Sequence, residues 1–304
     1  MKKIIRIIGA LLVGFLIWYL VIKPYDYLVT FKIKANTGTI NQSLKLWNSS
    51  LENSTSLQQE NLNSLLQQVK TNDSTYTYNW AIDSLNDSMS QVKVYVKDIN
   101  NSFQNKISTP FSTTDFEKTT KNTITDFIQK LKEHLKRIKV TVKGESKTQS
   151  TYCAYVSFKG KQIEKAKGMM KNYSFLNSVL FGNSSKVKAN GTPFVEITKW
   201  NIEKDSIEYN FCFPIIKSNS LPKHELLKYK EYKGVKAIKA VYNGNYITSD
   251  RAWYALLEYA KKENIAVQET PVEVFYNNPN YGGSELRWKA EIFMPIKGNE
   301  HSKK

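Results

Sequence analysis

The pattern of hydrophobic and polar positions opens with a long apolar run that starts at Ile4, is broken by Arg6, and continues without a charge to Ile22. As a helix, these 19 residues span about 28 Å, close to the hydrocarbon thickness of a bilayer. The run predicts a single transmembrane anchor within residues 1–24. A cleaved signal peptide is the alternative, but the run ends in the bulky sequence IWYLVIKP rather than in small residues.

The next segment, residues 25–145, has the pattern of a mixed α+β domain. Residues 25–36 alternate as a strand, and residues 74–84 and 91–99 read as a hairpin. Apolar residues at helical spacing predict a helix over residues 40–47. Ser112 and Asp115, in capping-box-like spacing, open a long helix. Its apolar stripe comprises Ile124, Phe127, Ile128, Leu131, Leu135 and Ile138.

The last segment, residues 148–298, repeats itself. Residues 149–217 and residues 230–297 each read strand, helix, strand, strand. The landmarks that align are Gly160 with Gly244, Thr192-Pro193 with Thr270-Pro271, and Pro214-Ile215 with Pro295-Ile296. A repeat of this length is too small to bury a face alone, so the two βαββ units are expected to pair into one domain with pseudo-twofold symmetry.

Both segments resemble known families. The order of elements in residues 25–145 is similar to the START-like (SRPBCC, polyketide-cyclase-like) helix-grip fold, in which a long helix packs across a curved sheet. The doubled βαββ unit, the Tyr-x-Gly-x-Tyr of residues 242–246, and an acid four residues before the closing proline resemble the GyrI-like (AraC-type effector-binding) domain. That resemblance implies a groove that binds multidrug-type lipophilic cations.

Glu291 is the candidate centre of that groove. It lies in the strand-like stretch RWKAEIFMPI, whereas the matching stretch of the first repeat has Asn210 at that position. A carboxylate among apolar residues is costly to bury unless a partner satisfies it. Glu291 therefore either pairs with Lys289, Arg287 or a neighbouring strand, or faces a cationic ligand. With the resemblance, the candidate ligand-binding residues are Glu291, Tyr242, Tyr246, Trp253, Tyr276, Asn210 and Phe293.

The first repeat departs from the family pattern. Lys161 and Gln162 follow Gly160 where an aromatic residue is expected, and Thr198 stands where the second repeat has Tyr276. The groove is therefore expected to be asymmetric, with one acid and aromatic walls mainly from the second repeat.

Composition narrows the class of function. The net charge is +17, but only four of the 44 basic residues are arginine, the residue that dominates specific phosphate and base contacts. We expect a solvated lysine-rich surface and no nucleic-acid partner. The two cysteines and three scattered histidines predict no disulfide scaffold, no metal site and no catalytic imidazole.

These observations predict a membrane-anchored, small-molecule-binding protein that acts as a non-catalytic sensor or sequestering module, without a cofactor. The positive residues before the anchor place the folded part in the periplasm or outside the cytoplasm, although Lys23, Lys32 and Lys34 weaken this orientation. Two alternatives stay open. One is a hydrolase that uses the pocket glutamate, and the other is a lipid-binding or lipid-transfer protein that uses the START-like cavity.

Overall fold

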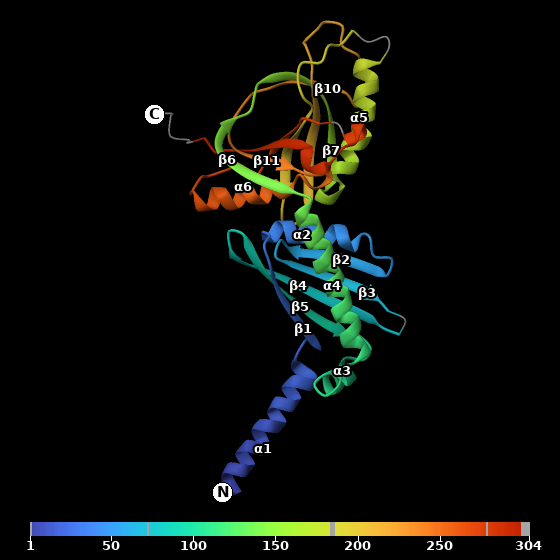
Figure 1. Cartoon of the computed structure of the whole chain (residues 1–304), viewed down its shortest axis with the longest axis vertical. Coiled ribbons are helices and arrows are strands. Elements are labelled where there is room, and N and C mark those ends of the chain that lie inside the picture. Colours follow the sequence, from blue (N-terminus) through green and yellow to red (C-terminus); the bar gives the residue numbers. More distant parts are fainter. Residues whose placement is uncertain (1, 72, 183–185, 278, 299–304) are drawn as a thin grey trace. The chain divides into compact units, whose positions relative to one another are not determined.

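The computed structural model describes residues 2–71, 73–182, 186–277 and 279–298. It is a mixed α+β structure with two antiparallel sheets and an apolar N-terminal helix. The chain divides into two compact units, residues 1–132 and 133–304, and the boundary falls inside helix α4 (Figure 1). Each unit is described separately.

The first unit begins with the apolar helix. Helix α1, Lys2–Ile17, continues as a π-helical turn, Trp18–Ile22, and together they are long and apolar enough to cross a membrane. A signal sequence near an N-terminus has the same properties. The other elements of this unit are β1 (Tyr27–Ile33), α2 (Thr37–Asn48), β2 (Ser54–Asn61), β3 (Ser64–Lys70), β4 (Thr75–Asn86), β5 (Met89–Asp98), α3 (Ser102–Ser108) and α4 (Asp115–Lys136).

A five-stranded sheet in the order β1-β5-β4-β3-β2 forms the body of this unit. The rings of Trp47 from α2, Trp80 from β4 and Phe127 from α4 lie within 6.2 Å of one another, so both helices pack on the same face of the sheet. The indole of Trp47 also donates to Asp126 of α4 at 2.7 Å. The long helix is thus held across the sheet by one aromatic cluster.

Several sequence expectations for this unit need correction. The polar stretch between α2 and β4, in which the hydrophobic pattern predicts no element, forms the hairpin β2–β3. Gln67 explains how a polar strand can be buried, because its side chain donates to Asn48 and accepts from the indole of Trp80. The cap of α4 is Thr114, whose hydroxyl accepts from the backbone of Glu117 at 3.1 Å. The expected cap, Ser112, instead donates to the carbonyl of Ser108.

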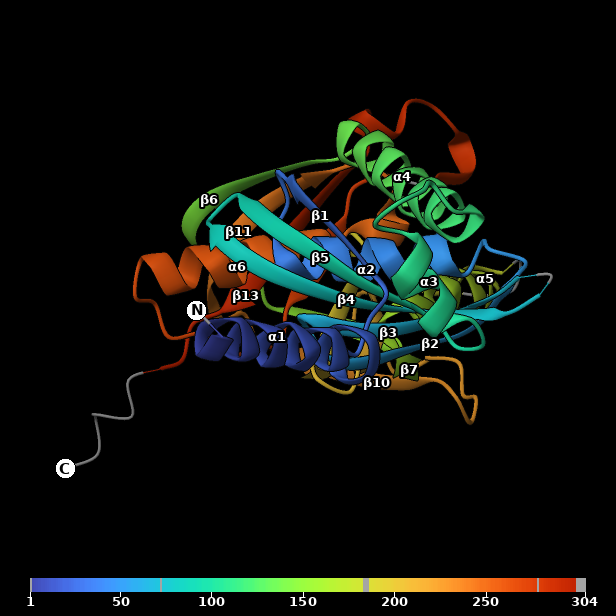
Figure 2. The same ribbon diagram turned by 90° about the horizontal axis from the view of Figure 1, so that it is seen from below.

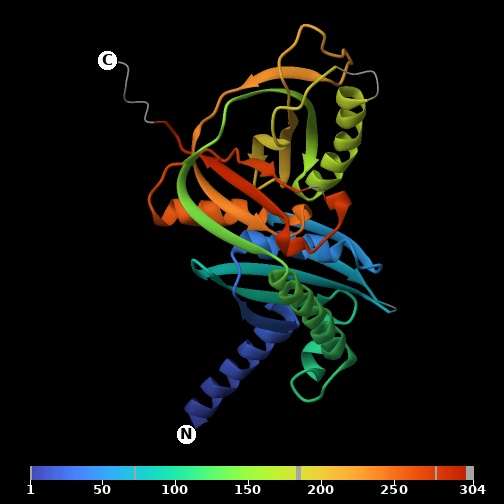
Figure 3. The same cartoon turned by 45° about the horizontal axis from the view of Figure 1, so that its top comes forward.

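The second unit is built on one eight-stranded sheet in the order β10-β7-β9-β8-β12-β13-β11-β6. Figures 2 and 3 show its strong curvature. Its elements are β6 (Lys139–Lys147), β7 (Thr151–Lys161), α5 (Lys165–Phe181), β8 (Phe194–Asn201), β9 (Ser206–Pro214), β10 (Lys228–Tyr232), β11 (Lys236–Asn243), α6 (Arg251–Lys262), β12 (Val272–Phe275) and β13 (Lys289–Pro295). Short 3-10 turns occupy Gln162–Glu164, Tyr246–Thr248, Pro279–Tyr281 and Glu285–Arg287.

The strand order is mirrored about the β8–β12 pair. The first repeat contributes β7-β9-β8 and the second contributes β12-β13-β11. Strand β6, which precedes the first repeat, pairs with β11 of the second. Strand β10 of the connecting segment pairs in turn with β7 of the first repeat. Residues 139–147 thus belong to the second sheet, whereas the sequence pattern predicts residues 25–145 as the first domain.

Helices α5 and α6 cover one face of this sheet and leave the other face open for a groove. On β12, Glu273 points to the helix face, and its neighbours Val272 and Val274 point to the opposite face. The landmark Gly244 has φ +146, and a Cβ there would lie 2.6 Å from the hydroxyl of Tyr242. This position therefore requires glycine.

Candidate functional site

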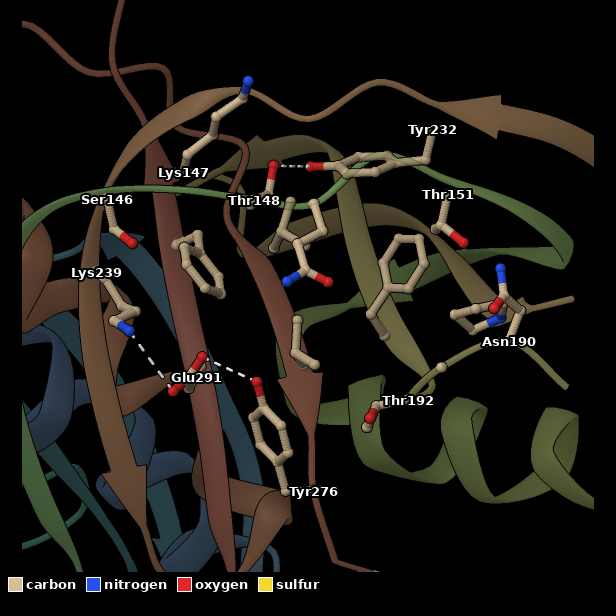
Figure 4. Close-up of a pocket in the computed structure, with 17 residues that line it drawn as sticks. Ser146, Lys147, Thr148, Thr151, Asn190, Thr192, Tyr232, Lys239, Tyr276 and Glu291 are labelled. Carbon is tan, nitrogen blue, oxygen red and sulfur yellow. Dashed lines mark hydrogen bonds and ion pairs between the residues drawn. The ribbon is translucent and has the colours of Figure 1, made fainter.

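A cavity of about 450 Å³ lies on the open face of the second sheet, a volume in the range of small-molecule sites. Residues 146–151, which lead from β6 into β7, form one wall, and the loop at residues 190–192 forms another. Figure 4 shows these side chains around the cavity. The lining residues are Ser146, Lys147, Thr148, Gln149, Thr151, Asn190, Gly191, Thr192, Phe194, Pro214, Tyr232, Lys239, Val272, Val274, Tyr276, Glu291 and Phe293.

The floor of the cavity is apolar. Phe194, Val272 and Phe293 come from three adjacent strands and belong to one buried cluster with Tyr232. The register explains the grouping, because Val272 pairs with Phe293 on one side and with Glu196 on the other. Alternate residues of β8, β12 and β13 therefore present one continuous surface to the cavity.

Glu291 stands at one side of this floor with three partners. Its carboxylate accepts a hydrogen bond from the hydroxyl of Tyr276 at 2.9 Å and pairs with the ammonium groups of Lys289 at 2.9 Å and Lys239 at 3.6 Å. Figure 4 shows Lys239 and Tyr276 converging on it from opposite sides. Burial raises the pKa of Glu291, but the hydrogen bonds from Lys289 and Tyr276 and the nearby lysine charges outweigh it and hold this pKa below its usual value. Glu291 is therefore ionised at neutral pH.

The pKa of Tyr276 is shifted in the opposite direction, above its usual value. Burial, the hydrogen bond to Glu291 and the negative charge of Glu291 raise the pKa of Tyr276 to about 12. Its hydroxyl therefore keeps its proton and acts as a donor at neutral pH. The ammonium of Lys289 also lies over the ring of Tyr276, 4.4 Å from the ring centroid, in a cation–π contact.

Three of the seven sequence-predicted site residues line the cavity: Glu291, Tyr276 and Phe293. The other four are not among the described lining residues. Tyr242 is buried, and its hydroxyl lies 2.7 Å from that of Thr248. Tyr246 donates to the carbonyl oxygen of Lys289, and the indole of Trp253 donates to Glu273. The structure thus brings together the residues of β13 and the end of β12, but not those around α6.

Asn210, the first repeat's counterpart of Glu291, lies on the same face of the sheet but outside the cavity. Its amide donates to Glu196 at 2.9 Å, and its oxygen accepts from Ser157. Glu196 also pairs with Lys230. The first repeat therefore does carry an acid on this face, placed one strand away from Asn210 and paired with Lys230 of strand β10.

Sequence reasoning missed several residues of the site. Lys239 reaches Glu291 because it pairs with Phe293 across β11 and β13, a register that the sequence pattern does not reveal. Thr148 and Tyr232, whose hydroxyls lie 3.0 Å apart, close the far wall through the pairing of segments more than 80 residues apart. Among these three residues, only Lys239 stands out in the sequence pattern, because it is a charged residue in the middle of a mainly apolar strand.

Other chemistry is sparse. Among the described residues, no group of three or more His, Cys, Asp or Glu side chains could hold a metal ion. Cys153 and Cys212 are both buried and unbridged, and they belong to the same buried cluster as Phe194, Val272 and Phe293 of the cavity floor.

Comparisons with known proteins give fold likenesses only. No family model matches the chain, and no curated protein matches it. Among solved structures, the C-terminal domain of EcmrR is 10% identical, with a TM-score of 0.42 over 53% of this chain and 99% of that one. SAV2435 bound to tetraphenylphosphonium is 14% identical, with a TM-score of 0.36 over 53% and 97%. A protein described as a hydrolase from Listeria innocua is 8% identical, with a TM-score of 0.32 over 53% and 92%. These scores assign no activity to the chain.

Proposed function

We propose that the second unit binds one small amphipathic molecule in the groove and performs no chemistry on it. The observation that carries this proposal is the pairing of an apolar floor with one carboxylate, Glu291, among the lining residues that the structure describes. The hydrophobic part of such a ligand fits over Phe194, Val272 and Phe293. Its polar or cationic head group fits at Glu291. A few convergent polar groups on an apolar surface are typical of ligand sites.

The charge that a ligand can carry depends on the strength of the ion pairs that Glu291 makes with Lys289 and Lys239. A cationic head has to replace an ammonium group that is already there. Lys289 is 42% exposed, and ion pairs of this kind contribute about 0–1 kcal/mol, so its exchange for a ligand cation costs little. Lys239 is less exposed and stays in place. We therefore propose a lipophilic ligand with at most one positive charge.

The membrane anchor is a second part of the proposal. We propose that residues 4–22 stay attached as a transmembrane helix and that the folded units lie outside the cytoplasm. Support comes from Lys106, whose ammonium donates to the carbonyl oxygens of Leu20 and Lys23. The folded first unit thus holds the end of the apolar helix, which a cleavage near residue 24 would remove. A mature protein whose mass lacks residues 1–24 would contradict this part.

The finer fold assignments are also proposals. The long helix α4 across a five-stranded sheet supports a START-like first unit. The mirrored strand order about β8 and β12 supports a GyrI-like duplication in the second. The hydrolase and lipid-transfer alternatives remain predictions, and no contact described above favours either one.

A pair of ligands with the same shape and opposite charge tests the binding proposal. Tetraphenylphosphonium and tetraphenylborate are titrated into the full chain in lipid nanodiscs, with empty nanodiscs as the blank. We expect saturable binding of the cation, weakened about tenfold in Glu291→Gln, because the substitution removes the Coulomb attraction between the carboxylate and the phosphonium charge, and a tenfold change corresponds to about 1.4 kcal/mol. Lys289→Gln removes a competitor and is expected to strengthen cation binding.

Glu208→Gln is the matched control, because Glu208 is also a strand carboxylate paired with a lysine, Lys159, but does not line the cavity. It is expected to leave both affinities unchanged. Preferred binding of the anion, or equal cation binding in the parent chain and in Glu291→Gln, would contradict the proposed role of Glu291.

A further inference from the structure

The segment around α3 presents four large apolar side chains to solvent. Ile99, Phe103, Ile107 and Phe111 are 51%, 61%, 45% and 87% exposed. They recur every four residues, and the middle two lie on one face of α3. We refer to these four residues as the α3 patch. Its size calls for a partner, because exposed apolar clusters on soluble domains commonly mark interaction surfaces.

The α3 patch is fixed to the end of the apolar helix. The ammonium of Lys106 donates to the carbonyl oxygens of Leu20 at 3.3 Å and Lys23 at 2.6 Å. It also lies 4.0 Å from the buried carboxylate of Asp26. That carboxylate accepts from the hydroxyl of Ser102, the first residue of α3. Figure 2 shows α3 next to the end of the apolar helix.

This end of the apolar helix has the chemistry of a membrane–water interface. Trp18 and Tyr19 lie in the last turn of this helix and Tyr25 follows it, and aromatic belts of this kind are typical of the head-group region. The ammonium of Lys23 lies 4.7 Å from the ring centre of Tyr19 and 4.4 Å from that of Tyr25. A bilayer that accepts the helix therefore ends where α3 begins.

We propose that the α3 patch inserts into the head-group boundary of the same bilayer that holds the apolar helix, as a second membrane contact. This inference rests on the proposed anchor. Continuity with the helix end favours lipid over a protein partner. Residues 99–111 contain one charged side chain, Lys106, and it is turned inward to the helix end. The remaining polar residues of the segment are Asn, Gln, Ser and Thr, which suit a zwitterionic surface without a specific anionic lipid.

The contact would restrict how the first unit can tilt on its tether. A single helix leaves a domain free to swing, whereas a second apolar contact at the helix exit fixes its orientation relative to the membrane. The proposal therefore concerns a surface that positions the folded units.

Depth-dependent fluorescence quenching tests this inference on the full chain. Its two native cysteines are buried, so a cysteine introduced by Phe103→Cys or Phe111→Cys can carry an environment-sensitive dye. The matched control is Leu85→Cys, an exposed apolar position near the β4–β5 turn, at the opposite end of β4 from Tyr76 and Asp98. Each labelled chain is reconstituted in phosphatidylcholine vesicles with or without head-group spin-labelled lipid and recovered by flotation.

We expect strong quenching at positions 103 and 111 and no quenching above the unlabelled-lipid level at position 85. Flotation without quenching at 103 and 111 overturns the docking of the α3 patch while the anchor stands. Equal quenching at all three positions overturns it as well. A dye shift that depends on protein density and not on the spin label identifies a second copy of the chain as the occupant instead. Chains that fail to float overturn the anchor and the inference together.

Discussion

Two glutamates on neighbouring strands of the second sheet show how the same side chain serves two purposes. Glu273 on β12 pairs with Ile292, and the next residue pair in the register is Val274 with Glu291. The two carboxylates are thus close in the sheet but point to opposite faces. Glu273 faces the helices, and Glu291 faces the groove.

Glu273 is fully enclosed and satisfied by the protein itself. One oxygen accepts from Lys165 and from the indole of Trp253, and the other accepts from Lys165 and from the hydroxyl of Ser249. Lys165 lies at the start of α5 in the first repeat, whereas the other three residues belong to the second. Burial raises the pKa of Glu273, and the Lys165 charge opposes this rise. Glu273 therefore joins the two repeats and is closed to a ligand.

Glu291 has a similar number of partners, but they can be exchanged. Lys289 is partly exposed, and the carboxylate borders a cavity. Its pKa is held below the usual value, so a negative charge is available at the groove at neutral pH. The comparison indicates that a carboxylate becomes a candidate for binding when solvent or a ligand can replace its partners.

The largest expected effect is the loss of stability in Glu273→Gln. This change leaves the Lys165 ammonium buried without its counter-ion, a defect that costs about 3–5 kcal/mol. Hydrogen exchange of the β12 and α6 backbone, followed by mass spectrometry, reports the local free energy of opening. Glu291→Gln serves as the comparator and is expected to change that free energy by about 0–1 kcal/mol. Equal losses of opening free energy in Glu273→Gln and Glu291→Gln would contradict the difference between a structural Glu273 and an exchangeable Glu291.

A smaller effect is expected when both members of the buried pair are replaced. In Lys165→Met with Glu273→Met, no charge is left unpaired, and buried ion pairs are often replaceable by apolar residues of similar volume. We expect the double variant to regain most of the protection that Glu273→Gln loses. A double variant that exchanges as fast as Glu273→Gln would show that the hydrogen bonds to Ser249 and Trp253, rather than the charge balance, hold the repeats together.

The smallest effect is the pH dependence of the contribution from Glu291. The lowered pKa of Glu291 gives stability that is present above its unfolded pKa and is lost as pH falls through the folded value. The difference in unfolding free energy between the parent chain and Glu291→Gln, measured across the acid range, should therefore shrink as pH falls. A difference that stays constant or grows as pH falls would contradict the exchangeable, ionised state of Glu291.

The two glutamates also show which features of the site can be predicted from the sequence. Alternation along β13 placed Glu291 and Phe293 on one face, and its residue pattern marked Glu291 as unusual. The same pattern could not mark Glu273, because its partner Lys165 is 108 residues away and reaches it only through the pairing of the repeats. Periodicity thus located strands and helices, while the partners of each acid depended on long-range register.

The aromatic residues were misplaced for a related reason. Tyr242, Tyr246 and Trp253 were predicted to line the groove from their motif and from the resemblance. Their hydrogen bonds instead hold the 3-10 turn at Tyr246–Thr248, the carbonyl oxygen of Lys289 and Glu273. Tyr276, at the exposed end of β12, is the one predicted tyrosine that reaches the cavity. Any ligand role for the other three stays a prediction.

The most direct test of the central claim follows both carboxylates at once during ligand binding. The full chain is labelled with ¹³C at the glutamate side-chain carboxyls, and the signals are assigned from the Glu291→Gln and Glu208→Gln variants and from Glu273→Gln if it folds. Tetraphenylphosphonium is then titrated in. The account predicts that the Glu291 signal moves with a saturable ligand dependence while the Glu208 signal and the buried Glu273 signal stay fixed. Saturable binding that leaves the Glu291 signal unchanged would contradict it.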